Sequence, residues 1–169
     1  MGPANRAQDQ IDRIERVTAH HADFVDKSLR ENSAFSLAEF EMLHKVALTG
    51  GRIRFIDLAR ITLLSQSRVS RQIDALQAKG FLRREVTASD KRATFAAITT
   101  EGQRALEAAL ESFAQAYRRH FLDIIPKGRL SSFSSVLRLL MQNEDYVAVY
   151  RETVERARAD NGLKSRKQD

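Results

Sequence analysis

The segment 65–79 carries short or hydrogen-bonding side chains at helical spacing: Ser67, Ser70, Arg71 and Asp74. Apolar residues occupy the opposite face of the same predicted helix: Val69, Ile73 and Leu76. Ser65 is a suitable N-cap, and Gly80 after Lys79 is a stop signal. Arginine can donate two hydrogen bonds to guanine, and serine can bond to bases or phosphates. The polar face is therefore a candidate for reading base pairs, with a solvated helix face as the alternative.

A basic hairpin is predicted directly after this helix. Phe81 to Val86 indicates a strand, Ala93 to Ile98 a return strand, and 87–92 a polar tip between them. We expect Arg92 to reach a DNA minor groove and Lys91 to contact phosphate. An ordinary polar hairpin tip is the alternative. A helix followed by such a hairpin has the order of a recognition helix and a wing.

Other polar residues around the helix are candidates for weaker DNA contacts. Ser65 and Gln66 lie at the helix start, where Gln66 can reach a base or a phosphate. Several arginines are candidates for phosphate contacts that do not depend on base sequence: Arg52, Arg54, Arg68, Arg83 and Arg84. Asp74 would repel phosphate, so we expect it to orient a basic neighbour.

The excess positive charge is concentrated in the segment 52–92. This segment holds ten Lys or Arg and four Asp or Glu, which equals the net charge of +6 of the whole chain. The rest of the sequence has eighteen residues of each sign. Such a basic patch favours a polyanionic partner, although a solvated charged face is the bland alternative.

The composition excludes several classes of site. The 169 residues include no cysteine, which excludes disulfides, thiolate zinc sites and cysteine nucleophiles. The four histidines lack the i, i+4 spacing of a helical metal site, and no phosphate loop or nucleophile elbow is present. We therefore expect no catalytic residue, metal or cofactor, and no enzyme. A polar N-terminus and the absence of a long apolar run predict a cytoplasmic protein without a membrane partner.

The remaining sequence is mostly amphipathic helix. Helices are predicted for Ala7–Glu31, for the segment from the Ser36–Glu39 capping box to Gly50-Gly51, for Ile56–Leu64, for Thr99 or Thr100 to Pro126, from Ser131 or Ser132 onward, and for Asp145–Arg158. Arg52–Phe55 is a candidate third strand. One apolar stripe is predicted to be buried in the helix after Ser132: Phe133, Val136, Leu137, Leu140 and Met141.

These elements define a mainly α fold with a small β-hairpin wing. We predict a winged helix-turn-helix domain at 35–99, flanked by dimerisation helices at 7–34 and 100–160, and a disordered tail at 161–169. The apolar stripes of the long helices exceed what the small centre can cover, so we expect the ends to pack together and against a second copy. A two-fold dimer would place two recognition helices roughly 34 Å apart on a palindromic site.

The central run resembles the MarR family of winged-helix bacterial transcriptional regulators, most densely from Phe55 to Leu106. The motifs that carry the resemblance are Leu58-Ala59, Ser65 through Leu76, Lys79-Gly80-Phe81-Leu82, Asp90-Lys91-Arg92 and Thr99-Thr100-Glu101-Gly102. Two positions depart from the family pattern. Ile56 stands where a capping Ser or Thr is common, and Leu63 where a turn glycine is common. A ragged helix start and a different turn conformation are therefore expected.

The resemblance implies a homodimer whose first and last helices form the dimerisation region. Its two lobes would bind a pseudo-palindromic operator on double-stranded DNA, usually as a repressor, with Asp90 holding Arg92 in position. It also implies release of DNA by a small effector, often an aromatic acid, in the crevice between lobe and dimer region. Candidates for that crevice are His20, His21, Tyr117 and His120, with Arg118 and Arg119; packing at a dimer interface is their alternative role. The rival function is a winged-helix module for protein–protein interaction or non-specific DNA binding.

Overall fold

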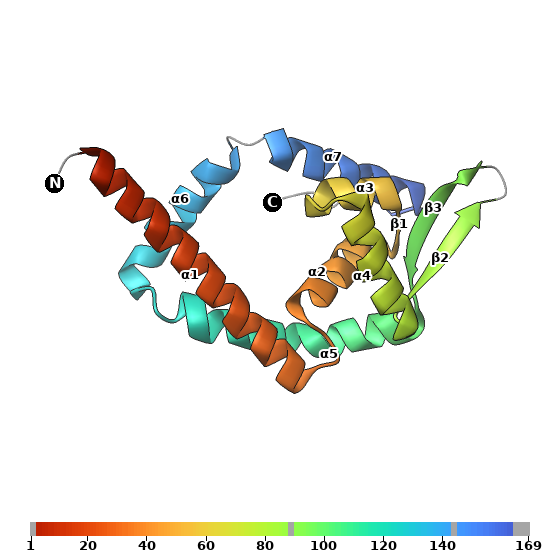
Figure 1. Ribbon diagram of the computed structural model, residues 1–169, viewed down its shortest axis with the longest axis horizontal. Helices are drawn as coiled ribbons and strands as arrows, with labels where there is room; N and C mark the ends of the chain where they lie inside the picture. The colour runs from red at the N-terminus through yellow and green to blue at the C-terminus, as the bar shows by residue number, and fades with distance from the viewer. Residues whose placement is uncertain (1–2, 88–89, 143–144, 164–169) are drawn as a thin grey trace.

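The computed structural model describes residues 3–87, 90–142 and 145–163, without the side chains of 3–7, 87, 90–92, 140–142 and 145–146. Its elements in chain order are α1 (Pro3–Asn32), α2 (Leu37–Leu48), β1 (Arg52–Arg54), α3 (Phe55–Thr62), α4 (Gln66–Ala78), β2 (Leu82–Thr87), β3 (Asp90–Ile98), α5 (Thr100–Tyr117), α6 (Leu130–Gln142) and α7 (Asp145–Asp160). A mainly helical chain with one small sheet, as predicted, is visible in Figure 1. None of the helices described is long and apolar enough to cross a membrane.

The three strands form one antiparallel sheet in the order β1-β3-β2. The predicted third strand is therefore confirmed, with Ile53 opposite Ala96. The predicted polar tip at 87–92 is wrong in its second half, because β3 already begins at Asp90, which pairs with Thr87. The register of the two strands shifts between Val86 and Thr87.

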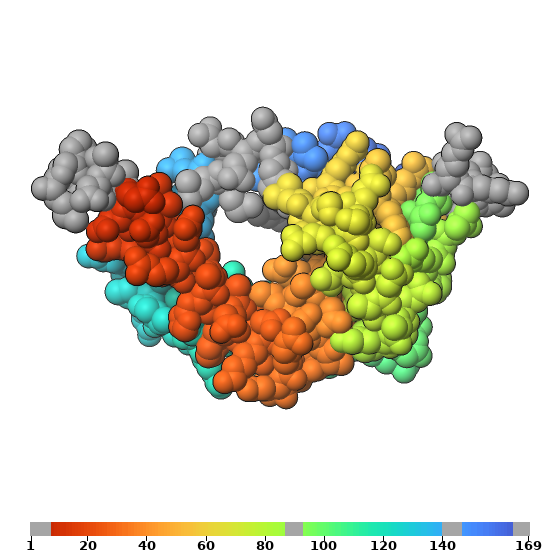
Figure 2. All heavy atoms as spheres, viewed as in Figure 1, coloured from red at the N-terminus to blue at the C-terminus, as the bar shows by residue number. Residues whose placement is uncertain are grey.

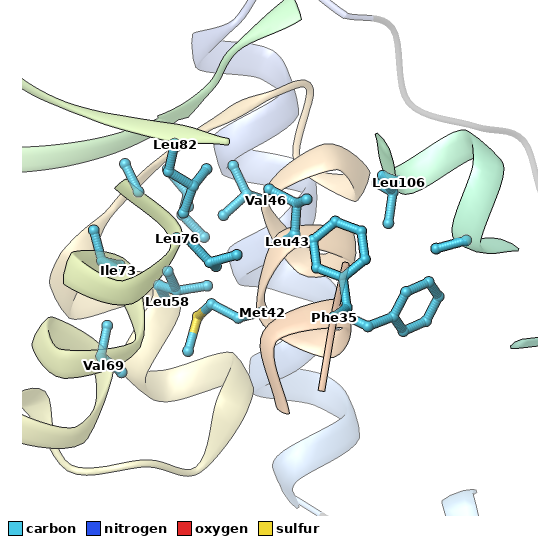
Figure 3. Close-up of a cluster of buried hydrophobic side chains, with 14 of the residues drawn as sticks. Phe35, Met42, Leu43, Val46, Leu58, Val69, Ile73, Leu76, Leu82 and Leu106 are labelled. Atoms are coloured by element: carbon cyan, nitrogen blue, oxygen red, sulfur yellow. The ribbon is translucent and has the colours of Figure 1, made fainter. Parts of the chain in front are cut away.

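The hydrophobic core lies where α2, α3, α4, the sheet and α5 meet (Figure 3). Its centre consists of side chains with no exposed surface: Leu43, Val46, Leu58, Ile73 and Leu76. Each such side chain contributes roughly 1.5–3 kcal/mol by leaving water. The predicted apolar face of α4 is thus confirmed, and its burial forces the polar face outward.

The predicted helix from Thr99 to Pro126 is interrupted. The α-helix ends at Tyr117, a π-helical turn covers Arg118–Leu122, and a 3-10 turn at Lys127–Arg129 follows Pro126. The wider π turn brings His120 against α1, where its ring stacks on Phe24 at 4.1 Å between centroids. Contacts with α1 therefore prevail over continuous α-helical geometry.

Two amphipathic helices expose apolar residues in the single chain. Val136 and Leu137 of α6 are 53% and 43% exposed in the single chain, so the predicted buried face of this helix is not covered within one chain. The side chains of Leu140 and Met141 lie outside those described. Ile14 and Val17 on the first half of α1 are likewise 65% and 56% exposed. No described residue of the same chain covers these surfaces.

Helix α7 packs against α3 in the central lobe. Arg156 donates to Asp57 at 2.7 Å, and Thr153 is buried in the contact. Beyond the helix, the Asn161 side-chain amide donates to the carbonyl oxygens of Thr49 and Arg52 at 2.8 and 2.7 Å. The predicted disordered tail from 161 is therefore wrong for its first residues, while 164–169 lie outside those described.

Candidate nucleic-acid interface

The start of α4 is fixed by its own cap and by the turn before it. The Ser65 hydroxyl accepts from the Arg68 amide, which confirms the predicted N-cap. Leu63 adopts the left-handed conformation with φ of 55°, the conformation that glycine adopts most easily. At the start of α3, Arg54 supplies no side-chain cap, in agreement with the ragged start expected at Ile56. The turn thus keeps a left-handed residue despite the loss of glycine.

The exposed face of α4 holds the predicted readout residues, and most of them are engaged within the chain. The hydroxyls of Ser65 and Ser67 lie 3.1 Å apart. Arg84 of β2 donates to the Ser70 hydroxyl at 3.1 Å and to the Asp74 carboxylate. Arg71 has no hydrogen-bond or ionic partner among the described residues and is free for a ligand.

Five of the eight basic residues in 52–92 whose side chains are described are ion-paired. The pairs are Arg52 with Glu85, Arg60 with Asp57, Lys79 with Glu39, Arg83 with Glu85, and Arg84 with Asp74. The two Glu85 pairs lower the pKa of that carboxyl, with the Arg52 hydrogen bond as the main cause. Arg54 instead lies over the Phe95 ring at 5.4 Å. Within the described part of the chain, Arg54, Arg68 and Arg71 remain without a carboxylate partner.

A hollow of about 530 Å³ lies between α2 and the first half of α4. Its basic lining consists of Lys45, Arg68 and Arg71, against one acidic residue, Glu41. Burial lowers the pKa of Lys45, whose ammonium group also lies 4.9 Å from the centre of the Tyr150 ring. On the face shown in Figure 2, an opening separates the N-terminal half of α1 from α3 and α4. The hollow offers cations to an anion next to the recognition helix.

For the three predicted contact residues of the wing, the structure describes only the backbone. Asp90, Lys91 and Arg92 form the first residues of β3, next to the turn, and their side chains lie outside those described. At the base of the wing, the Arg52 guanidinium lies 3.5 Å from the centre of the Phe95 ring. The minor-groove role of Arg92, and the role of Asp90 in holding it, remain predictions.

The predicted crevice residues come together as a packed aromatic cluster. Nδ1 of His21 lies 3.4 Å from Nδ1 of His120, and the His20 and His120 rings are 4.9 Å apart. Tyr117 meets His21 edge-on at 4.3 Å. Burial and the neighbouring His120 both lower the pKa of His21. Among the residues described, no group of three or more His, Asp or Glu is arranged to hold a metal ion.

Sequence reasoning missed two features of this surface. Arg84 was expected to contact phosphate, and it was not identified as the basic neighbour expected for Asp74. The strand that carries Arg84 and the helix that carries Asp74 meet only through tertiary folding, so no local pattern links the two residues. Sequence reasoning also overlooked Glu41 and Lys45, which line the hollow from α2. Their i, i+4 spacing places both polar side chains on one face of α2, which was a usable signal.

Comparison with known proteins agrees with this geometry. The MarR family model matches residues 35–93, whereas no curated protein sequence matches the chain. Sco3205, a MarR family transcriptional regulator from Streptomyces coelicolor solved in complex with DNA, is 25% identical with a TM-score of 0.73, over 86% of this chain and 91% of that one. AbsC, a MarR family regulator from the same organism, is 24% identical with a TM-score of 0.70, over 84% and 95% of the two chains.

A third similar structure is BpsR from Bordetella bronchiseptica, whose DNA binding is regulated by 6-hydroxynicotinic acid. It is 19% identical with a TM-score of 0.67, over 79% of this chain and 93% of that one. At this identity the likeness speaks for the fold alone. The MarR family model thus matches the helix-turn-helix and wing, and the chain is similar over most of its length to MarR family transcriptional regulators, one of them solved with DNA.

Proposed function

We propose that this regulator binds a specific pseudo-palindromic operator as a homodimer and represses transcription from it. The observation that carries the proposal is Arg71 on the exposed face of α4, which has no hydrogen-bond or ionic partner among the described residues. A guanidinium without an internal partner can form the bidentate contact to guanine O6 and N7 that discriminates between base pairs. The neighbouring Arg68 supplies a contact to phosphate.

The uncovered apolar surfaces of α1 and α6 support the homodimer. Ile14 and Val17 on α1, and Val136 and Leu137 on α6, are each more than two-fifths exposed in the single chain. Exposed apolar side chains at helical spacing favour burial against another molecule, and a second copy supplies the same two helices. The two-fold axis of such a dimer matches the symmetry of an inverted repeat.

A small organic acid is the proposed effector. The hollow lined by Lys45, Arg68 and Arg71 supports this part of the proposal, because cations beside a carboxylate form strong charge-assisted hydrogen bonds. The cluster of His20, His21, Tyr117 and His120 is the second candidate region. BpsR is regulated by 6-hydroxynicotinic acid, which suggests an aromatic carboxylate as the class of effector for this protein.

Selection of bound sequences from a random DNA pool tests the main proposal. An inverted repeat is expected, and Arg71→Ala should weaken binding to it by about 1–3 kcal/mol, roughly 5–150-fold, and relax the preference at one base pair. Arg13→Ala removes the same charge from an exposed position on α1 and is the matched control. An equal loss of affinity on random DNA would favour the rival function, a module for non-specific binding.

Effector binding is tested by thermal shift with aromatic carboxylates, followed by DNA release. A ligand that binds the folded protein raises its melting temperature. Lys45→Met should abolish the shift if the hollow binds the acid, whereas His120→Phe should abolish it if the aromatic cluster does. Absence of any shift across the series would reject an aromatic acid effector and leave the DNA-binding proposal standing.

A further inference from the structure

One arginine on the wing joins two residues of the DNA-facing surface of α4. We propose that Arg84 is a specificity-determining residue. Asp74 holds its guanidinium in place, and the guanidinium makes the Ser70 hydroxyl a hydrogen-bond donor toward DNA. This inference rests on the proposed function, in which α4 faces base pairs. It predicts that Ser70 acts only as a hydrogen-bond donor to DNA, although a serine hydroxyl can in general either donate or accept.

Arg84 contacts Ser70 and Asp74 through a single nitrogen atom. The same Nη2 atom of Arg84 lies 3.1 Å from the Ser70 hydroxyl oxygen and within hydrogen-bond distance of the Asp74 carboxylate. Ser70 and Asp74 are four residues apart on α4, so both side chains meet β2 from adjacent turns. The guanidinium carbon also lies 5.1 Å from the centre of the Phe55 ring. Arg84 is therefore held from α4 and from α3.

The chemistry of the guanidinium fixes the role of the serine. Arginine has donors only, so the Ser70 oxygen must accept from it. The hydroxyl hydrogen stays available, while the remaining lone pair lies beside a positive charge and becomes a poor acceptor. Ser70 thus presents a donor to its surroundings.

A fixed donor selects among the base edges of the major groove. It matches N7 and O6 of guanine, N7 of adenine and O4 of thymine, whereas cytosine presents only its N4 amino donor. Without the arginine, a serine hydroxyl contacts any of these bases. The base that meets Ser70 should therefore be any base except cytosine.

The ion pair separates this role from a phosphate contact. Asp74 balances the charge of Arg84, and the Arg84 side chain is 36% exposed. A residue that neutralises a DNA phosphate contributes close to one unit to the salt dependence of binding. Replacing Arg84 by an uncharged residue should leave that slope unchanged and alter base preference at one position instead.

The test compares selected sequence profiles and salt slopes for the wild-type protein and five variants. The wild type should reject cytosine roughly 5-fold or more at one position in each half-site, because a wrong base costs about 1–3 kcal/mol. Ser70→Ala and Arg84→Met should lose this rejection at the same position and keep the rest of the profile. Arg84→Lys retains a donor and should preserve it.

Arg83→Met is the matched control, because Arg83 lies on the same strand and pairs with Glu85 instead. It should leave the profile unchanged. The inference is overturned if Arg84→Met keeps the profile, lowers affinity equally on all sequences, or reduces the salt slope by about one. Asp74→Asn covers the case in which Arg84→Met fails to fold, and it should weaken the same rejection. A wild type without any sequence preference would refute the proposed function itself.

Discussion

Gly102, in the first turn of α5, should not tolerate a side chain. A Cβ atom at this position would lie 2.1 Å from the Phe81 carbonyl oxygen and 2.9 Å from its carbonyl carbon. Real Cβ contacts essentially never fall below 3.0 Å. Because the obstacle is backbone, Gly102→Ala must push the start of α5 away from the residue that precedes β2.

The energetic cost can be worked from the contacts at this junction. The Thr99 amide donates to Phe81 O at 3.1 Å, and the Thr99 hydroxyl donates to Gly80 O at 2.7 Å. Overpacking costs about 1–3 kcal/mol, and each hydrogen bond weakened by the shift costs about 1 kcal/mol. Alanine regains about 1 kcal/mol of helix propensity. We expect Gly102→Ala to lower the free energy of unfolding by about 2–4 kcal/mol.

Urea unfolding followed by circular dichroism measures this change. Gly128→Ala is the matched control, because a Cβ there meets nothing within 4 Å and the backbone φ is not positive. The control should be neutral or stabilised by up to about 1 kcal/mol, through the lower entropy of the unfolded chain. If Gly102→Ala is as stable as Gly128→Ala, the account of the α5 junction is wrong.

Two further predictions concern α7 and the histidines. Asp57→Asn should weaken the attachment of α7 by about 1–2 kcal/mol, because it replaces the buried carboxylate that pairs with Arg156 at 2.7 Å. Limited proteolysis measures this as faster removal of α7, and an unchanged rate would contradict it. Burial lowers the folded-state pKa of His21 and His44 below the ordinary value of 6.5, so protonation favours the unfolded state. The contribution of these histidines to the free energy of unfolding should be complete above pH 6.5 and should fall as the pH drops below that value. Unfolding at pH 5 and at pH 7.5 measures the loss. A variant with both histidines replaced by phenylalanine should not show this loss.

Local signals explain why much of the lobe could be predicted from sequence. The Ser65 cap, the Ser36–Glu39 capping box and the stop at Gly80 each depend on residues within one helical turn. The apolar spacing of α4 fixes its buried face, and therefore its exposed face, without knowledge of its neighbours. For the same reason Ser67, Ser70 and Arg71 could be selected as a surface before their surroundings were known.

Contacts between distant segments explain what the sequence did not reveal. The Arg156–Asp57 pair joins residues 99 positions apart, and no local pattern distinguishes a helix that docks on α3 from one that joins a dimer region. The π turn at Arg118–Leu122 likewise depends on rings of α1 that pack against it. Periodicity identified the apolar stripe of α6 but could not tell whether the same chain would cover it.

The pairing of the basic residues changes the meaning of the charge count. By sequence, six of the ten cations in 52–92 are candidates for phosphate contacts, and Arg71 and Arg92 are candidates for contacts in the grooves. In the folded lobe, at least five of them pair with carboxylates, and three of these pairs link separate elements: Arg52–Glu85, Lys79–Glu39 and Arg84–Asp74. Those five already have an internal partner, whereas Arg71 has none among the described residues. Affinity and specificity should therefore depend on few side chains, since the same charges that attract a polyanion also maintain the shape that recognises it.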